Sequence, residues 1–468
     1  MTKSDIVARE KGLLRDLSQG QLTMIALGSA IGTGLFLGSG FAVSLAGPAV
    51  ILSYVVAAIV ALIMMGCLSE MAVAHPAAGS FGAYAEMYIG PFAGWSVRYT
   101  YWACQVIAVG GEVVAAAIYM QYWFPNIPSW IWMVAFAALM VYINASSVSN
   151  FGTFEYWFSM IKVSAIVFFI ITGVAVVFGI GTEPIGVANL TKEGGFFPKG
   201  LSGVWMGVVM AIFSFIGVEV VAVTSGEAKH PEVAIPKAMR TMVLRLIIFY
   251  LFSLTIMLCV VPWTQAGGKV SPFVQVFSAV GIPYAAGIMN FVVLTAALSS
   301  MNANLYLTSR MMFSLARGNY APRVLGKLSK RGTPVNALLA STGGIALAVL
   351  LQTLGNESAY LYTFGIALFG ALFVWSMIIV TFFRFRASRI REGAKPLPTR
   401  MPLHPVLPGI GLVLLVSIMV TFYFHEFFRV GVYSGIGWLI LMYISYLAFG
   451  RRNYAATDKQ VLIDTNNA

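Results

Sequence analysis

The chain has 468 residues, of which 59% are apolar and only 10% are charged, and its mean hydropathy is +0.84. Soluble domains carry about 25% charged residues, so no water-soluble fold can cover this much apolar surface. The 46 scattered Gly, the 19 Pro and the three Cys exclude a collagen-like repeat and a disulfide framework. The composition therefore predicts an integral membrane protein.

Twelve apolar stretches reach the roughly 20 residues that a helix needs to cross a bilayer. Their predicted cores are residues 22–45, 49–73, 95–123, 129–146, 156–179, 201–224, 243–261, 284–315, 337–354, 360–382, 406–424 and 432–449. None of them shows the polar–apolar alternation of a membrane β-strand. The predicted fold class is all-α, with twelve transmembrane helices.

Lysine and arginine in the loops predict the orientation, because they concentrate on the cytoplasmic side. With the N-terminus inside, only Lys192, Lys199, Lys269 and Arg429 of the 29 basic residues fall in outer loops. Both termini are therefore expected in the cytoplasm. The net charge of +12 then reflects topology, with contact to anionic lipid headgroups as an alternative, and no nucleic-acid partner is expected.

The first span contains a glycine-rich run that weakens its helix. Each Gly costs about 1 kcal/mol relative to Ala in a helix interior, and unwound backbone at membrane depth is tolerated where it lines a cavity or meets a ligand. A half-helix that starts near Gly34 would aim free N–H groups at an anion. The alternative is close helix packing through small residues. The run is Gly28-Ser29-Ala30-Ile31-Gly32-Thr33-Gly34.

The sixth span carries a second interruption, Phe213-Ser214-Phe215-Ile216-Gly217-Val218-Glu219. Interrupted helices at corresponding positions of two halves are the best sequence pointer to a transporter binding site. The two interruptions together favour a binding loop over simple packing. Phe213 and Phe215 are candidate gate residues, or else lipid-facing or core bulk.

Three ionisable residues lie well inside the spans, where charge is expensive: Glu112, Lys162 and Glu219. We expect the Lys162 ammonium to donate to carbonyls freed near residues 29–32, and snorkelling to the interface is the alternative. Glu112 and Glu219 have the alternative of structural carboxylates. Glu70 and Glu227 lie near helix ends and are expected at the interface.

An ordered set of motifs covers nearly the whole chain. It resembles an amino acid permease of the amino acid–polyamine–organocation superfamily, in its bacterial amino acid transporter branch. Besides the two interruptions, the set is Gly12-Leu13-Leu14-Arg15-Asp16-Leu17, His75-Pro76-Ala77-Ala78-Gly79-Ser80-Phe81, Gly226-Glu227-Ala228-Lys229-His230-Pro231 and Ala297-Leu298-Ser299-Ser300-Met301-Asn302.

The resemblance implies a leucine-transporter-type fold, a five-plus-five inverted repeat with the first and sixth helices broken. Residues 1–18 would then be a cytoplasmic segment and 19–182 the first repeat. Residues 183–385 would be the second repeat, 386–450 two accessory helices and 451–468 a cytoplasmic tail.

The resemblance also implies site residues. A substrate carboxylate would meet N–H groups around Thr33 and Gly34, and its amino group the carbonyls near Ala30, Phe213, Ser214 and Ile216. Lys162 would couple protons, Phe213 would be a gate, and Glu219 would face the substrate side chain or the proton path. The full expected substrate set is Ala30, Gly32, Thr33, Gly34, Phe213, Ser214, Ile216, Gly217 and Glu219, with Glu112, Ser299 and Asn302 as accessory candidates.

The leading expectation is a proton-coupled importer of amino acids in a bacterial cytoplasmic membrane, monomeric or weakly oligomeric. An exchanger on the same fold is the alternative, and an amino-acid-sensing receptor is the alternative from another class. No nucleophile–base pair, metal-ligand spacing or phosphate-binding loop occurs in the sequence. We therefore expect no enzyme activity, no metal and no cofactor.

Overall fold

The computed structural model describes residues 3–8, 13–14, 16–36, 38–77, 79–180, 183–228, 231–266, 272–280, 284–353 and 359–453. Of the residues singled out above, Gly12, Arg15, Ala78, Lys229, His230, Lys269 and the tail after residue 453 lie outside this part. Within it the structure is helical, and the one extended pairing is an isolated bridge between Leu17 and Ala228.

The helices up to residue 190 are α1 (Lys3–Ala8), α2 (Gln19–Ala30), α3 (Thr33–Phe36), α4 (Gly38–Ala46), η1 (Gly47–Ala49), α5 (Val50–Ala74), α6 (Ser80–Tyr88), α7 (Pro91–Gln121), α8 (Ser129–Ser146), α9 (Val148–Phe178) and η2 (Ala188–Leu190). Those that follow are α10 (Gly200–Ala211), η3 (Ile212–Phe215), α11 (Val220–Val223), η4 (Thr224–Glu227), α12 (Pro231–Val260), η5 (Trp263–Gln265), α13 (Pro272–Val280), α14 (Ala285–Arg317), η6 (Arg323–Gly326), α15 (Val335–Ala340), α16 (Gly343–Thr353), α17 (Ala359–Arg391), α18 (Val406–Thr421), η7 (Phe422–Phe424), α19 (Glu426–Ser445) and the π-helical turn η8 (Tyr446–Gly450).

Local sequence signals fix where several helices begin and end. Ser18 caps α2 in a capping box, in which its hydroxyl accepts from the Gln21 N–H and the Gln21 side chain accepts from the Ser18 N–H. Ser147 caps α9 in the same sense, by accepting from the Asn150 N–H at 3.1 Å. The left-handed Gly179 ends α9, where a side chain would be strained.

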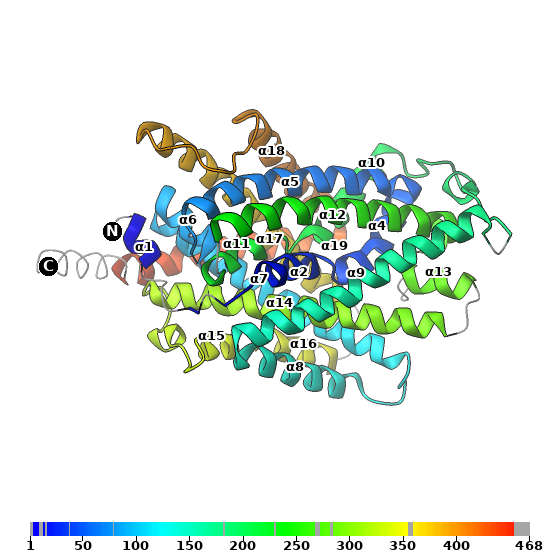
Figure 1. The fold of residues 1–468 in the computed structure, drawn as a ribbon, viewed down its shortest axis with the longest axis horizontal. Helices are drawn as coiled ribbons and strands as arrows, with labels where there is room; N and C mark the ends of the chain where they lie inside the picture. The colour runs from blue at the N-terminus through cyan, green and yellow to red at the C-terminus, as the bar shows by residue number, and fades with distance from the viewer. Residues whose placement is uncertain are drawn as a thin grey trace, which may run out of the picture.

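The helices run mostly along the long axis of the molecule (Figure 1). At the centre, α14 packs along α7 and α17 packs against the same α7, while α2 packs on α9 and α12 on α5. This arrangement places the first and sixth predicted spans inside the bundle. The helices α1 and η8 lie at the same end of the molecule (Figure 1).

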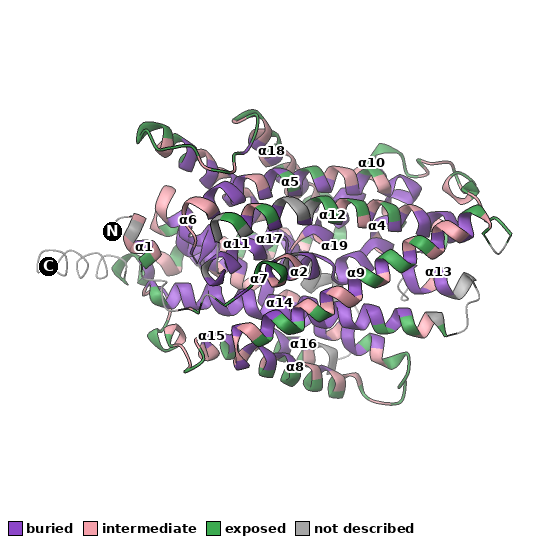
Figure 2. Ribbon diagram, viewed as in Figure 1, coloured by how far each residue is buried: buried purple, intermediate pink, exposed green. Residues whose placement is uncertain are grey.

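The outward faces of the helices are apolar. Phe168 and Ile171 of α9, Ile248 of α12 and Val413 of α18 are each more than half exposed, and exposed and half-buried residues follow the periphery (Figure 2). Exposed apolar surface on this scale is what a bilayer covers. Ten helices in the described part are long and apolar enough to cross a membrane, so the chain is a multi-pass membrane protein.

The count of twelve spans stays a prediction, because two of the predicted spans are divided. The first, 22–45, consists of α2, α3 and α4, and the ninth, 337–354, is divided between α15 and α16. The apolar segment across this second division, Val335–Leu350, falls short of a full crossing by length. The sixth predicted span is α10, η3 and α11 in series, and it does reach membrane length.

Buried carboxylate–arginine pairs tie helix ends together. Glu70 pairs with Arg386 at 2.7 Å and Glu227 pairs with Arg310 at 3.0 Å. Both carboxylates are buried within the protein, at 3% and 1% exposure, and their expected position near the membrane interface stays a prediction. Burial of an unpaired carboxylate would cost several kcal/mol, so each arginine makes the burial of its partner possible. Their partners come from helices distant in sequence, which residue spacing does not reveal.

Candidate functional site

The first helix is interrupted where the glycine-rich run predicts it. The helix α2 ends at Ala30, Ile31 leaves the helical region with a φ of −84° and a ψ of 82°, and α3 begins at Thr33. Gly28 is required for a close approach, because a Cβ there would lie 2.7 Å from Glu155 Oε1 and closer still to Ser159. The run therefore both interrupts the helix and packs closely, while the binding loop stays a prediction.

The sixth span is interrupted at the same depth. After η3, Ile216 is extended, and Gly217 has a φ of +104°, which side chains rarely adopt. A Cβ on Gly217 would lie 2.7 Å from the Ser29 carbonyl oxygen. The Ser29 hydroxyl donates to the Gly217 carbonyl at 2.9 Å, so the two interruptions touch each other directly.

A tyrosine from a third helix joins the two interruptions. The Tyr250 hydroxyl of α12 lies 2.8 Å from the carbonyl oxygen of Ala30 and 2.7 Å from that of Ser214. A hydroxyl has one proton, so it donates to one of these carbonyls at a time. Tyr250 is fully buried, and its ring packs edge-on against Tyr54 and Phe215. It thereby fixes the distance between the two unwound segments.

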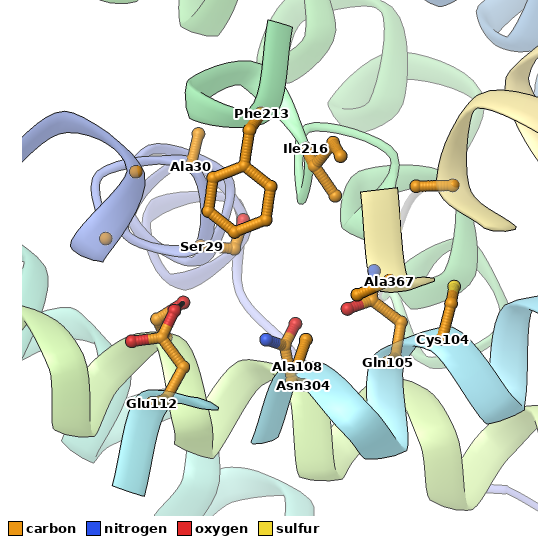
Figure 3. Close-up of a pocket in the computed structure, with 14 residues that line it drawn as sticks. Ser29, Ala30, Cys104, Gln105, Ala108, Glu112, Phe213, Ile216, Asn304 and Ala367 are labelled. Atoms are coloured by element: carbon orange, nitrogen blue, oxygen red, sulfur yellow. Dashed lines mark hydrogen bonds between the residues drawn. The ribbon is translucent and has the colours of Figure 1, made fainter. Parts of the chain in front are cut away.

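A pocket lies beside the two interruptions (Figure 3), and its empty space, together with the open solvent at its mouth, is about 460 Å³. Five of the predicted substrate residues line it, Ala30, Gly32, Gly34, Phe213 and Ile216, and so does the accessory candidate Glu112. The Phe213 ring lies between Ala30 and Ile216 and points toward the middle of the pocket (Figure 3). The other predicted residues of the two interruptions do not line it: Thr33, Ser214, Phe215, Gly217 and Glu219.

Three other helices complete the wall, and except for Glu112 their lining residues were not predicted as site residues. Each contributes positions spaced by four, which share one helix face: Cys104 and Ala108 with Glu112 on α7, Ser300 and Asn304 on α14, and Ala367 and Ala371 on α17. Gln105 of α7 also lines the pocket. Its amide nitrogen has no hydrogen-bond partner among the described residues, and its side chain points into the pocket (Figure 3).

Glu112 presents a carboxylate to the pocket. Its Oε1 accepts from the Thr33 hydroxyl at 3.0 Å and from the Ser300 hydroxyl at 2.9 Å. Its Oε2 is buried with no hydrogen-bond partner in the described part of the chain. Thr33 therefore contacts Glu112 and orients its carboxylate at the pocket. The second carboxylate oxygen of Glu112 remains available to a ligand or a proton.

Glu219 is fully buried and both of its oxygens are bonded. Oε1 accepts from the Tyr101 hydroxyl at 2.8 Å, and Oε2 accepts from the Gly217 N–H at 3.1 Å. The carboxylate thus satisfies a backbone N–H that the interruption leaves without a helical partner. Ser214 and Phe215 also face away from the pocket, against Tyr54.

The Lys162 ammonium lies against the end of α2. Its three donors all have acceptors: the Gly28 carbonyl, the Ile31 carbonyl at 3.0 Å and the Ser299 hydroxyl at 2.8 Å. The side chain is fully buried, so it does not snorkel to the interface. The Ile31 carbonyl lies within the expected range 29–32, and the Gly28 carbonyl comes one residue before it.

Glu155 is a second buried carboxylate near Lys162, and sequence reasoning missed it. It accepts from the Ser299 hydroxyl and from the Asn302 amide at 3.0 Å, and Asn302 in turn accepts from Asn144 at 2.7 Å. The fifth span was predicted to begin at residue 156, but α9 begins at Val148. The available signal was the spacing of seven from Lys162, which is two helical turns along one face.

The buried charges therefore form one group around the first interruption. Ser299 contacts both Lys162 and Glu155, and Glu112 contacts Thr33 at the start of α3 and Ser300, the next residue along α14. No three His, Cys, Asp or Glu side chains gather as metal ligands in the part of the chain described. Lys162 places its ammonium on the carbonyls at this interruption.

A multi-pass helical bundle with a pocket between two interrupted helices is the architecture of membrane transporters. Residues 21–459 match the family described as amino acid permease. The chain is 40% identical over 450 residues to a gamma-aminobutyric acid permease of Bacillus subtilis, covering 95% of each chain. It is 40% identical over 438 residues to the aromatic amino acid transport protein AroP of Escherichia coli K12, covering 93% of this chain and 95% of that one.

A further relative is an uncharacterized amino acid permease, YtnA, of Bacillus subtilis, which is 38% identical over 457 residues and covers 97% of this chain and 99% of that one. The chain belongs to the amino acid permease family. It is therefore an amino acid transporter and not an enzyme, and the resemblance seen in its motifs is confirmed.

Proposed function

We propose that the chain imports amino acids together with protons by alternating access across a bacterial cytoplasmic membrane, as a monomer or weak oligomer. In this proposal both termini are cytoplasmic. Residues 19–182 and 183–385 form the inverted repeats, and 386–450 form two accessory helices. The observation that carries the proposal is the buried Lys162 ammonium on the carbonyls of Gly28 and Ile31.

The coupling follows from the hydrogen bonds of Lys162. A charged ammonium donates three bonds, whereas a neutral amine donates two and loses most of its attraction for Glu155 and Glu112. Loss of the proton would therefore weaken the contact between α9 and the end of α2. Glu155 shares Ser299 with Lys162 and is placed to accept that proton.

The substrate's ammonium and carboxylate are the groups that we propose the pocket recognises. Two relatives are named for gamma-aminobutyrate and for aromatic amino acids. Both kinds of molecule carry an ammonium and a carboxylate, although gamma-aminobutyrate has its ammonium on the γ carbon and no side chain. Free N–H groups near Thr33 and Gly34 suit the carboxylate. The carbonyls of Ala30 and Ser214 each keep a second lone pair beside the Tyr250 bond.

The substrate side chain would then extend toward Cys104, Gln105, Ala367 and Ala371. These side chains are neutral, and the carboxylate of Glu219 is already bonded on both oxygens. We therefore propose neutral amino acids as substrates, with Glu219 in its structural alternative. A competition screen of the twenty amino acids against one labelled substrate tests this assignment.

Transport by purified protein in liposomes tests the coupling. An inward proton gradient should drive accumulation of labelled amino acid into vesicles that contain no counter-substrate. Uptake only into preloaded vesicles would favour exchange, and binding without flux would favour a receptor.

Lys162→Ala should abolish accumulation driven by the proton gradient, because the variant lacks the titrating cation at the end of α2. The matched control is Lys192→Ala, an exposed loop lysine, which should transport as wild type. An unchanged pH dependence of transport in Lys162→Ala would show that the lysine does not couple protons.

A further inference from the structure

A second cavity, of about 750 Å³ and partly open to solvent, lies far from the substrate pocket. It is formed by the end of α5, the last turns of α17 and the loop before α18. Four cationic side chains line it, Arg386, Arg389, Lys395 and Arg400, together with one carboxylate, Glu70. The end of α17 and this loop extend from the bundle at the end where α1 lies (Figure 1).

The carboxylate in the cavity is already neutralised. Glu70 Oε2 accepts from Arg386 at 2.7 Å and from the Met401 N–H at 2.9 Å. The neighbouring Glu392 bonds instead to Lys3 and, at 2.7 Å, to Ser388. None of Arg389, Lys395 and Arg400 has an ion-pair partner among the described residues. The cavity therefore carries an uncompensated positive charge.

One of the cationic groups has a buried donor without an acceptor. Arg386 is 7% exposed, and its Nε makes no hydrogen bond within the described structure. A buried N–H that lacks an acceptor costs about 1–3 kcal/mol. The guanidinium lies 5.4 Å from the centre of the Phe382 ring. The unbonded Nε–H can be satisfied by an oxygen anion in the cavity that Arg386 lines.

The surroundings of the cavity are those of a membrane interface. The helix α17, which is long and apolar enough to cross a membrane, ends in arginine-rich turns at Arg391, and Ile390, which lines the cavity, is 74% exposed. An exposed apolar side chain beside arginines is the pattern expected at headgroup depth, where acyl chains and phosphates meet. An arginine can bind phosphate oxygens through two parallel N–H donors, whereas a lysine offers a single point charge.

We propose that this cavity binds a phosphate group, and that in the membrane its occupant is the headgroup of an anionic phospholipid. A soluble phosphate-bearing ligand has the same chemistry at the arginines, and Ile390 favours the lipid. The proposal does not depend on proton coupling, because no residue of the cavity belongs to the substrate pocket.

Native mass spectrometry of the full chain in detergent tests the proposal, with titration of phosphatidylglycerol, phosphatidylcholine and inorganic pyrophosphate. The test variant is Arg389→Gln/Lys395→Gln/Arg400→Gln. The matched control is Arg323→Gln/Lys327→Gln/Lys330→Gln, which removes the same charge from exposed positions of another loop. Phosphatidylglycerol should bind the test variant at least about tenfold more weakly than wild type, and the control within about twofold.

Arg400→Gln alone should give a smaller loss in the same direction, which guards against misfolding of the triple variant. Labelled amino acid binding should be unchanged in all of these variants. Pyrophosphate binding that depends on the three cations, without phosphatidylglycerol binding, would support the phosphate site and reject the lipid. Equal phosphatidylglycerol binding by wild type and test variant, or an equal loss in the control, would overturn the proposal.

Discussion

Glu112 and Glu219 are both buried carboxylates in the membrane, but their surroundings differ. Glu219 has both oxygens bonded, to Tyr101 and to the Gly217 N–H. Glu112 has one oxygen bonded, to Thr33 and Ser300, and the other without a partner at the pocket. The cost of burying a carboxylate identifies both positions, whereas the number of occupied oxygens separates a structural group from one available for transport.

The largest expected effect is on stability, from Glu219→Ala. This change leaves the Tyr101 hydroxyl and the Gly217 N–H buried without an acceptor, which should cost about 3 kcal/mol of unfolding free energy. Thermal unfolding of the purified protein measures the loss. Glu219→Gln keeps one acceptor and should recover part of it. A Glu219→Ala protein that is as stable as wild type but has lost substrate binding would show that Glu219, like Glu112, acts in transport and is not structural.

Glu112→Gln should show the opposite pattern. The glutamine oxygen can still accept from Thr33 and Ser300, so stability should change by less than about 1 kcal/mol. The initial rate of proton-driven uptake should fall by about 30-fold, or about 2 kcal/mol, because the pocket loses its charge. Uptake within twofold of wild type would show that the free oxygen of Glu112 is not used.

Tyr250, like Glu219, has a structural role in this account, but its hydroxyl is neutral; Tyr250→Phe tests that role. The variant loses the hydroxyl that reaches the Ala30 and Ser214 carbonyls, at a cost of about 1 kcal/mol of stability. The apparent substrate affinity should fall by a few-fold, because the two unwound segments are no longer held at a fixed distance. An increase in affinity would show that Tyr250 competes with the substrate amino group for these carbonyls.

Gln105→Leu should have the smallest effect and changes selectivity alone. Gln105 lies where the substrate side chain is proposed to extend, and its amide nitrogen has no hydrogen-bond partner among the described residues. The variant replaces this polar group with an apolar one. The ratio of affinities for apolar over polar neutral amino acids should rise by a few-fold, or about 1 kcal/mol. Competition binding measures this ratio, and an unchanged ratio would place the substrate side chain elsewhere.

The helix interruptions were predictable because their cause is local. Gly28, Gly32 and Gly34, and then Gly217, lower helix propensity over a few residues, and that effect is legible in the chain. The division of the ninth span between α15 and α16 was not predicted. The signal available in the sequence was the glycine pair that starts α16, Gly343 and Gly344.

The rest of the site depends on contacts between distant segments. The link from Tyr250 to Ala30 spans 220 positions, and residue spacing carries no trace of it. Glu155 was missed because apolar stretches give helix boundaries poorly, and α9 begins eight positions before the predicted core. The same limit applies to Gln105 and Asn304, which line the pocket only because α7 and α14 pack together there.

The movement of protons with substrate tests the central claim most directly. Proteoliposomes that contain a trapped pH indicator and no internal amino acid should acidify when a transported amino acid is added outside. The Lys162→Ala protein in the same vesicles should give no acidification. Uptake of labelled amino acid by the wild-type protein without any acidification would contradict proton symport.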